Sequence, residues 1–246
     1  MGINLHQDLI NINHEHWNRK PLLRTVYKEF YSLIAQNLSK LPDSKVVELG
    51  SGLGNIHEVI PDCIRTDLFA YPWIDQIENA YKLSFKDESV SDLILTDVFH
   101  HLKYPGTALK ELRRVLRKGG RLLMLEPCMS LLGSIVYGIF HVEPIAVTKN
   151  IEWFAPEGWS PEHIDYYAAQ GNATRIFVNG NFSSELKDWD SVKTIRLSAL
   201  AYAASGGYSS SQLYPTGMLP FMKTIEKVLD PFPGLFATRL LVILQK

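Results

Sequence analysis

The feature that most constrains the fold is a glycine-rich turn placed directly after a short apolar strand. Residues 46–55 read VVELGSGLGN, so two valines, an acid and a leucine lead into Gly50, Gly52 and Gly54. A bare glycine turn between a strand and a helix lets a ligand approach the backbone closely. In an open α/β sheet such a crevice lies at the carboxyl ends of the strands. The segment therefore predicts a ligand-binding α/β domain.

Short apolar segments alternate with amphipathic ones along much of the chain. We expect strands near 45–49, 63–68, 75–79, 91–98 and 121–127, helices over 22–41 and 107–118, and closing strands at 192–200 and 237–246. A helical stripe from Leu219 to Leu229 lies between the closing strands, Gly119 and Gly120 end the second helix, and residues 1–20 resist assignment. The pattern is typical of an α/β, doubly wound, mostly parallel seven-stranded sheet with helices on both faces.

Length and composition fit one globular domain. We interpret residues 1–246 as a single domain with a core at 22–127, an insertion at 128–190 that covers the carboxyl ends of the strands, and closing strands at 191–246. Hydrophobic residues make up 46% and charged residues 21%, with a formal net charge of −1, so no basic excess indicates nucleic acid. The apolar window 129–147 is interrupted by His141, Glu143 and Pro144. We expect a cytoplasmic protein without a transmembrane segment.

Three ligands compete for the glycine loop. A phosphate-binding P-loop requires a lysine after its last glycine, and Asn55 stands there instead. A dinucleotide site has the spacing G-x-G-x-x-G, whereas this loop has G-x-G-x-G, with Glu48 two residues before the first glycine. A carboxylate so close to the loop would repel the negative charge of a pyrophosphate. A cationic ligand such as S-adenosylmethionine (SAM) favours it.

The motifs in order resemble those of class I SAM-dependent methyltransferases. They are VVELGSGLGN, RTDL, ENAYKLSFKDESVSDLILTDVFHHL and LKELRRVLRKGGRLLMLEP, spread over residues 22–127. The likeness is to the broad subgroup that includes ubiquinone and menaquinone biosynthesis methyltransferases. It implies the Rossmann-like methyltransferase fold and SAM as cofactor, with S-adenosylhomocysteine as product.

The resemblance also implies roles for single residues. Glu48 and the loop Gly50, Ser51, Gly52 and Gly54 would hold the methionine part of SAM. Asp67, with Leu68 beside it, would accept hydrogen bonds from the ribose, although a helix N-cap is an alternative role for Asp67. Asn79 and Ala80 occupy the adenine-contacting position, where the family often has Asp-Ala. Asp97, Phe99 and His100 follow the fourth strand, where the family lines the methyl-transfer site.

The catalytic candidates are His100, His141 and Glu143, with His101 as a further histidine beside the first. An oxygen, nitrogen or carbon nucleophile can need a base near neutral pKa, which these side chains supply. The alternative is that they satisfy backbone groups in loops. No metal site is predicted, because His14-Glu15-His16 lacks a third ligand.

The acceptor is the least constrained feature. PWID at 72–75, FHVEP, GNATRIFV and SGGYS at 205–209 resemble methyltransferases found with cell-envelope polysaccharide or lipid pathways. The apolar run LLGSIVYGIF and the stripe up to Leu229 would suit a small or lipid-linked acceptor and leave room for peripheral membrane contact, or they simply pack on the sheet. The alternative functions are a non-catalytic SAM-binding protein and an NAD(P)-dependent oxidoreductase. The oligomeric state is not predicted.

Overall fold

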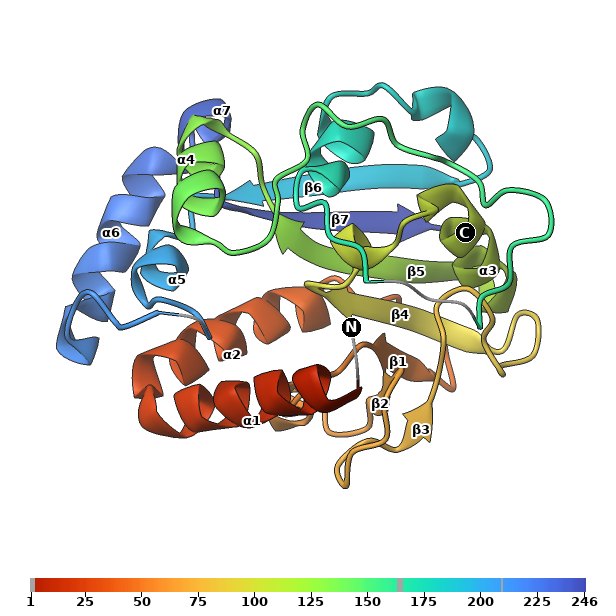
Figure 1. The fold of residues 1–246 in the computed structure, drawn as a ribbon, viewed down its shortest axis with the longest axis horizontal. Coiled ribbons are helices and arrows are strands. Elements are labelled where there is room, and N and C mark those ends of the chain that lie inside the picture. The colour runs from red at the N-terminus through yellow and green to blue at the C-terminus, as the bar shows by residue number, and fades with distance from the viewer. Residues whose placement is uncertain (1–2, 163–165, 209) are drawn as a thin grey trace.

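A computed structural model describes residues 3–162, 166–208 and 210–246, with the backbone alone for 3–9 (Figure 1). Its described residues form a seven-stranded sheet in the order β3-β2-β1-β4-β5-β7-β6. The pairs β1–β2, β1–β4, β2–β3 and β4–β5 are parallel, and β7 runs antiparallel to both β5 and β6. The predicted α/β class with a mostly parallel sheet is confirmed.

The elements follow the predicted alternation. The strands are β1 (Val46–Leu49), β2 (Ile64–Asp67), β3 (Gln76–Ile77), β4 (Val90–Thr96), β5 (Leu116–Pro127), β6 (Ser191–Leu197) and β7 (Arg239–Gln245). The α-helices are α1 (Ile3–Arg19), α2 (Pro21–Gln36), α3 (Pro105–Val115), α4 (Leu131–Phe140), α5 (Leu200–Ala204), α6 (Leu219–Leu229) and α7 (Pro233–Phe236). Shorter helical turns are η1 (Asn55–Glu58), η2 (Phe99–His101), the π-helical η3 (Thr174–Val178), η4 (Ser183–Leu186) and η5 (Thr216–Met218).

Two apolar clusters cover the two faces of the sheet. Alternate residues of a strand point to opposite faces, so neighbouring residues of β4 belong to different clusters. Leu93 and Leu95 pack with α3 and with the segment around η3, whereas Ile94 packs with α1, α2 and α5. The central strands are buried on both sides, as their continuous apolar sequences predict.

The N-terminal segment forms a long helix, although its sequence resisted assignment. Two of its few apolar side chains, Ile10 and Trp17, are buried. The Trp17 ring lies edge-on to Tyr27 of α2 at 5.9 Å between centroids, and it stacks with Tyr208 at 6.4 Å. Tertiary packing on α2 and on the segment after α5 therefore stabilises α1. Contacts of this kind leave only a weak periodic pattern of apolar residues in the sequence.

Two predicted helix ends are wrong by several residues. Helix α2 ends at Gln36 rather than near 41, because Ser39 turns to donate from its backbone N to Asp92 Oδ1 at 2.6 Å. Helix α3 ends at Val115, before the glycines predicted to end it. Gly119 and Gly120 lie inside β5, where both pair with the backbone of the C-terminal Lys246.

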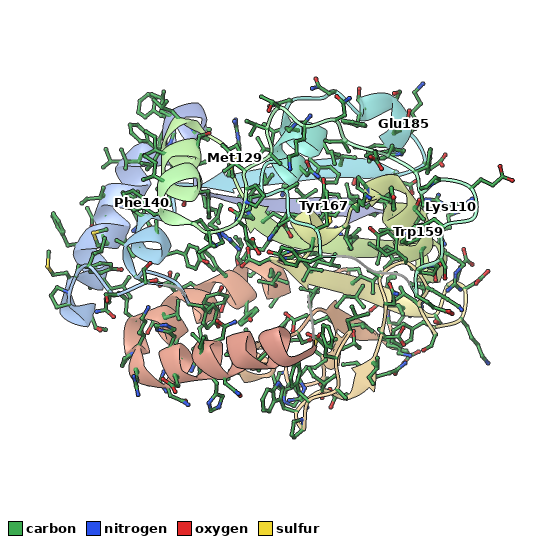
Figure 2. The ribbon with its side chains drawn as sticks, viewed as in Figure 1. Lys110, Met129, Phe140, Trp159, Tyr167 and Glu185 are labelled. Carbon is green, nitrogen blue, oxygen red and sulfur yellow. The ribbon has the colours of Figure 1, made fainter. Side chains whose placement is uncertain are left out.

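Helix α4, at the start of the segment 128–190, lies with the last helices on one side of the molecule, whereas the rest of that segment extends towards α3. Helices α4, α5, α6 and α7 lie at the left of the view in Figure 1. Phe140 at the end of α4 lies there too, while Tyr167 lies nearer the middle of the sheet in Figure 2. No helix among the described residues is both long enough and apolar enough to cross a bilayer.

Candidate functional site

A cavity of about 980 Å³ lies where the carboxyl ends of β1 and β4 meet the segments that cover them. Eight of the predicted site residues line it together. These are Glu48, Gly50, Ser51, Gly52, Asp97, His100, His141 and Glu143. Its size and mixed apolar and polar wall are typical of a site for a small molecule.

The Glu48 carboxyl lies in the wall of this cavity, and its polar atoms are not all hydrogen-bonded within the described residues. Its side chain is 1% exposed, and Oε2 has no hydrogen-bond partner among the described residues. Burial raises the pKa of Glu48 to about 8, with a hydrogen bond from Ser51 opposing the shift. The carboxyl therefore holds its proton at neutral pH until a cationic group approaches it.

The loop after β1 has the backbone that only glycines adopt easily. Gly50, Gly52 and Gly54 have φ angles of +70°, +51° and +69°. A Cβ at Gly50 would meet Val98 Cγ2 at 2.5 Å, whereas a Cβ at Gly52 would meet only Ile10 Cδ1 at 4.0 Å. Gly50 is therefore required by close packing, and Gly52 leaves space for a ligand beside the backbone.

The residues predicted for ribose and adenine lie apart from this cavity. Asp67 is buried at the end of β2, where Oδ2 accepts from Gly52 N at 2.9 Å and Oδ1 from Phe69 N at 3.2 Å. Leu68 follows it and is exposed. Asn79 donates from Nδ2 to Pro161 O at 2.9 Å and accepts at Oδ1 from the amide of Tyr81 at 3.0 Å.

Aromatic and charged side chains cover the same edge of the sheet. Trp73 donates from Nε1 to Gly52 O at 2.7 Å, and its ring carbon lies 3.2 Å from the Cβ position of Gly54. Arg65 approaches that position to 3.1 Å. Ala80, Gly54, Asp67, Leu68 and Asn79 are absent from the cavity lining. The predicted adenosine half thus lies beside the lining of this cavity, and Asp67 contacts that lining through Gly52.

A buried histidine–carboxylate pair forms part of the cavity wall. His100 Nδ1 lies 2.6 Å from Glu126 Oε2, and Glu126 Oε1 accepts from the amides of Val98 and Phe99 at 2.9 and 2.7 Å. Burial opposes protonation of His100, but the charge of Glu126 and hydrogen bonds to Glu126 and Glu143 raise the pKa of His100 to about 10. His100 is therefore a cation at neutral pH when no other ligand competes for its nitrogens.

Glu143 reaches the two histidines from the segment after α4. Its Oε2 lies 3.3 Å from His100 Nε2 and its Oε1 lies 3.7 Å from His101 Nε2. Burial opposes ionisation, but hydrogen bonding to His100 and the charges of both histidines lower the pKa of Glu143 below its usual range. Tyr166 Oη donates to Oε1 at 2.7 Å and Gln170 Nε2 donates to Oε2 at 2.9 Å.

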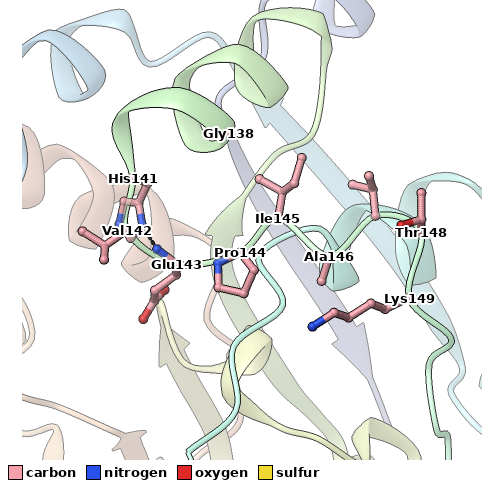
Figure 3. A pocket seen from close by; sticks show the side chains of 10 residues that line it. Gly138, His141, Val142, Glu143, Pro144, Ile145, Ala146, Thr148 and Lys149 are labelled. Atoms are coloured by element: carbon pink, nitrogen blue, oxygen red, sulfur yellow. Dashed lines mark hydrogen bonds between the residues drawn. The ribbon is translucent and has the colours of Figure 1, made fainter.

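His101 and His141, which lie near His100 in this wall, are uncharged at neutral pH. Burial and the neighbouring His100 lower the pKa of His101, whose Nδ1 lies 2.9 Å from Tyr167 O. Burial also lowers the pKa of His141, whose Nδ1 lies 2.7 Å from Gln170 Nε2. His141 and Glu143 also line a smaller hollow of about 470 Å³ beside Gly138 and residues 144–149 (Figure 3).

Four residues of the site were not predicted from the sequence. Glu126 follows the apolar run of β5 and Arg239 precedes the apolar run of β7, and that contrast is the signal that would have found them. Arg239 is 1% exposed, lines the cavity and keeps Nε without a partner among the described residues. Tyr166 and Gln170 lie in irregular backbone, and no sequence pattern marks them.

Comparisons with known proteins agree with the fold and the loop. Residues 47–124 match the family described as a methyltransferase domain. The chain is 30% identical over 145 residues to an alanine–tRNA ligase of Fervidobacterium nodosum, and 23% identical over 148 residues to a hybrid PKS-NRPS synthetase of a Fusarium species. The matches cover 51% and 46% of this chain but only 16% and 4% of those proteins. This chain therefore spans a small part of these relatives.

Two solved structures share the fold over nearly the whole chain. One is a SAM-dependent methyltransferase, described as a possible histamine N-methyltransferase, from Thermotoga maritima, with a TM-score of 0.52, 15% identity, and coverage of 99% of this chain and 96% of that one. The other is a SAM-dependent methyltransferase from Archaeoglobus fulgidus, with a TM-score of 0.53, 14% identity, and coverage of 91% and 94%.

These comparisons agree on the kind of protein that the chain resembles. Residues 47–124 match the methyltransferase-domain family, and the chain shares its fold with two SAM-dependent methyltransferases. The resemblance drawn from the sequence motifs is confirmed.

Proposed function

We propose that this protein binds SAM with its methionine part against Glu48 and the loop 50–54, and transfers the methyl group to an acceptor in the adjoining cavity. The observation that carries the proposal is the buried, unpartnered Oε2 of Glu48 in the cavity wall. A buried acceptor without a partner is costly, and an ammonium group would satisfy it. SAM carries an ammonium group and no phosphate.

The loop fits the same ligand. Gly52 presents backbone to open space, and Ser51 and Glu48 lie beside it in the cavity lining. Asp67 already accepts from Gly52 and Phe69, but each carboxylate oxygen keeps a further lone pair for a ribose hydroxyl. We therefore retain Asp67, with Leu68, Asn79 and Ala80, as the adenosine side of the proposed site.

The chemistry of transfer assigns different tasks to the cavity side chains. SAM supplies a methyl carbon activated by a positively charged sulfur, so the protein mainly has to position the acceptor and exclude water. His100 cannot accept a proton at neutral pH, because its pKa is raised to about 10. His101 and His141 are neutral and retain that capacity. We therefore propose that the acceptor lies among these histidines and Glu143.

We propose an amphipathic, lipid-linked acceptor. Helix α4 exposes Leu131, Ile135, Ile139 and Phe140, and Val142 follows with 94% of its surface exposed. Phe140 and Val142 also line the cavity, so this apolar surface is continuous with its wall. An exposed apolar surface beside a cavity is typical of a site for a greasy ligand.

The experiment supplies SAM labelled in its methyl group to the purified protein with two acceptor pools. One pool holds water-soluble sugars and amines, and the other holds isoprenoid-linked saccharides in detergent. We expect label in the second pool, reduced at least severalfold in Phe140→Ser and retained in Phe154→Ser, which alters an exposed phenylalanine outside the cavity. Label only in the first pool would overturn the lipid-linked acceptor. Binding of SAM without label in either pool would favour a non-catalytic SAM-binding protein.

A further inference from the structure

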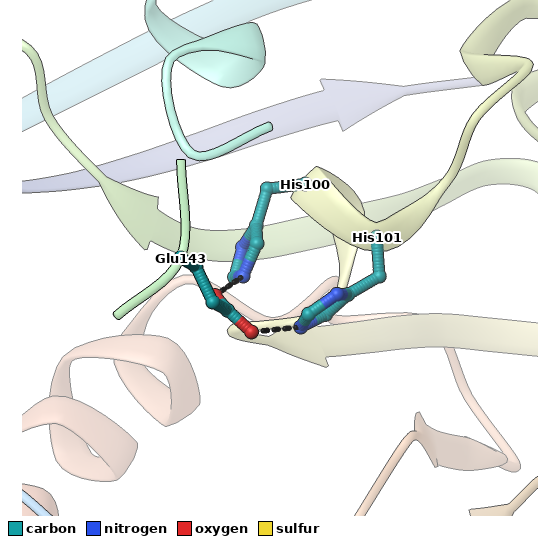
Figure 4. A group of neighbouring side chains, drawn as sticks. All are labelled: His100, His101 and Glu143. Atoms are coloured by element: carbon teal, nitrogen blue, oxygen red, sulfur yellow. Dashed lines mark ion pairs between the residues drawn. The ribbon is translucent and has the colours of Figure 1, made fainter. Parts of the chain in front are cut away.

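Three side chains of the kinds that bind metals converge at one side of the cavity (Figure 4). His100 and His101 come from η2, directly after β4, and Glu143 comes from the segment after α4. One nitrogen or oxygen from each of the three lies within 4.8 Å of the others. Two imidazoles and a carboxylate are a ligand set that divalent transition metals accept.

The other ring nitrogen of each histidine is already held in the way metal-binding histidines require. A histidine that binds a metal usually donates its second N–H to a carboxylate or to a backbone carbonyl. His100 Nδ1 faces Glu126 Oε2 at 2.6 Å, and His101 Nδ1 faces Tyr167 O at 2.9 Å. Both contacts place the Nδ1 hydrogens away from Glu143 and turn the Nε2 atoms towards it. Both histidines therefore present Nε2 towards Glu143 as the nitrogen open to a metal ion.

The spacing of the three side chains is close to that of ligands around one metal ion. The Nε2 atoms of His100 and His101 lie 3.3 and 3.7 Å from the oxygens of Glu143. A charge-assisted N–H···O bond spans roughly 2.7–2.9 Å, so neither contact is as tight as the His100–Glu126 pair. Tetrahedral ligands at roughly 2.0–2.1 Å from an ion lie about 3.3–3.4 Å from one another.

The surroundings fix Glu143 and supply negative charge. Tyr166 and Gln170 each donate to one oxygen of Glu143, so both carboxylate oxygens are held in place. Glu126 adds a second carboxylate behind His100, while Arg239 is paired with Asp97. Gln170 is 1% exposed, and its Oε1 has no partner among the described residues. This polar environment favours a bound cation over an empty cluster.

We propose that His100, His101 and Glu143 bind a divalent transition-metal ion, such as Zn²⁺ or Fe²⁺, through the two Nε2 atoms and a carboxylate oxygen. Three protein ligands leave at least one coordination position for an oxygen or nitrogen of the acceptor. On the proposed methyl-transfer function, the ion orients the acceptor and lowers the pKa of its nucleophile, a task otherwise left to His101. Binding of the ion itself does not depend on that function.

The test is a titration of the chelator-treated, full-length protein with Co²⁺, followed by visible absorption and by competition with Zn²⁺. We expect one equivalent of Co²⁺ to produce d–d bands that Zn²⁺ abolishes. His101→Ala and Glu143→Gln should each weaken Co²⁺ binding at least about tenfold. Loss of a residue that only hydrogen-bonds to a metal ligand already lowers metal affinity by about that factor. His57→Ala, which removes an exposed histidine after the glycine loop, should bind as the wild type does.

Two outcomes overturn the metal site. One is the absence of d–d bands in the folded wild type, and the other is unchanged Co²⁺ affinity in both variants. Thermal unfolding and calorimetric SAM binding are measured on the same preparations, so a misfolded variant is recognised directly. Co²⁺ binding without SAM binding would contradict the proposed function alone, and SAM binding without Co²⁺ binding would contradict the metal site alone.

Discussion

Arg239 Nη1 donates to Asp97 Oδ1 across 2.6 Å and thereby joins the last strand to the residue that follows β4. The guanidinium is 1% exposed and lies under the rings of Tyr202 and Phe30, at 4.9 and 5.6 Å from their centroids. Asp97 adopts a left-handed backbone with φ of +57°. The pair holds a strained residue at the floor of the cavity.

Removing the charge of Asp97 should therefore be costly. Asp97→Asn leaves the Arg239 guanidinium buried without its counter-charge, and breaking a buried pair typically costs about 3–5 kcal/mol. We expect a loss of that order in the free energy of unfolding, measured by urea denaturation. Glu162→Gln breaks the exposed Lys82–Glu162 pair and should cost less than about 1 kcal/mol. Equal losses in the two variants would show that the buried pair contributes no more to the free energy of unfolding than the exposed pair does.

Glu48 should make stability depend on pH. Its pKa is raised by burial to about 8 in the folded chain, against an ordinary value of 4.5 for a glutamate in the unfolded chain. Between these values the folded chain keeps a proton that the unfolded chain releases, so the stabilising contribution is full below about pH 4.5 and lost as pH rises through 8. Thermal unfolding should therefore show Glu48→Gln gaining stability relative to wild type from pH 5 to pH 8.5. A difference that stays flat over that range would exclude a raised pKa.

Gly52 should be required for cofactor binding more than for folding. An alanine there has a strained left-handed backbone, costing roughly 1–2 kcal/mol, but meets no close atom in the protein. Its methyl group would project into the space proposed for SAM. Gly180 has φ of +74° with open space around it, so Gly180→Ala carries the same backbone strain far from the loop. Calorimetry should show SAM affinity lost in Gly52→Ala and retained in Gly180→Ala; equal affinities would place the ligand elsewhere.

Glu126 should control the charge of His100 in the metal-free protein. The raised pKa of His100, about 10, depends on the nearby charge of Glu126 against an opposing burial effect. Glu126→Gln removes that charge, so the pKa of His100 should fall, while Glu162→Gln should leave it unchanged. Titration of the imidazole signals by NMR measures both. A His100 signal that titrates below pH 7 in the wild type would contradict the assigned charge.

The mostly parallel seven-stranded sheet was predictable because its central strands carry apolar runs bounded by glycines and polar turns. Helix ends were less predictable, since distant partners decide them. Asp92 draws Ser39 away from α2, and Lys246 pairs with Gly119 inside β5. Helix α1 depends on the ring contacts of Trp17 with Tyr27 and Tyr208. No local sequence pattern predicts these contacts.

The candidate site likewise has residues that were predictable from the sequence and residues that were not. Glu48 and the glycine loop were predictable because a short motif carries them, and His100 followed because it lies directly after a strand. The contact of Glu143 with His100 and His101 was not predictable, because it joins segments more than forty residues apart in the chain through irregular backbone. The roles predicted for Asp67 and Asn79 stay predictions, since both side chains are engaged with the protein itself.

The most direct test of the central claim is a calorimetric titration with SAM, S-adenosylhomocysteine and NAD, on the wild type and on Asp67→Asn. We predict micromolar binding of SAM and S-adenosylhomocysteine to the wild type, weakened at least about tenfold in the variant as expected for a lost charged acceptor. NAD should not bind. Binding of NAD alone, or of none of the three, would contradict the assignment of the loop and of the reaction built on it.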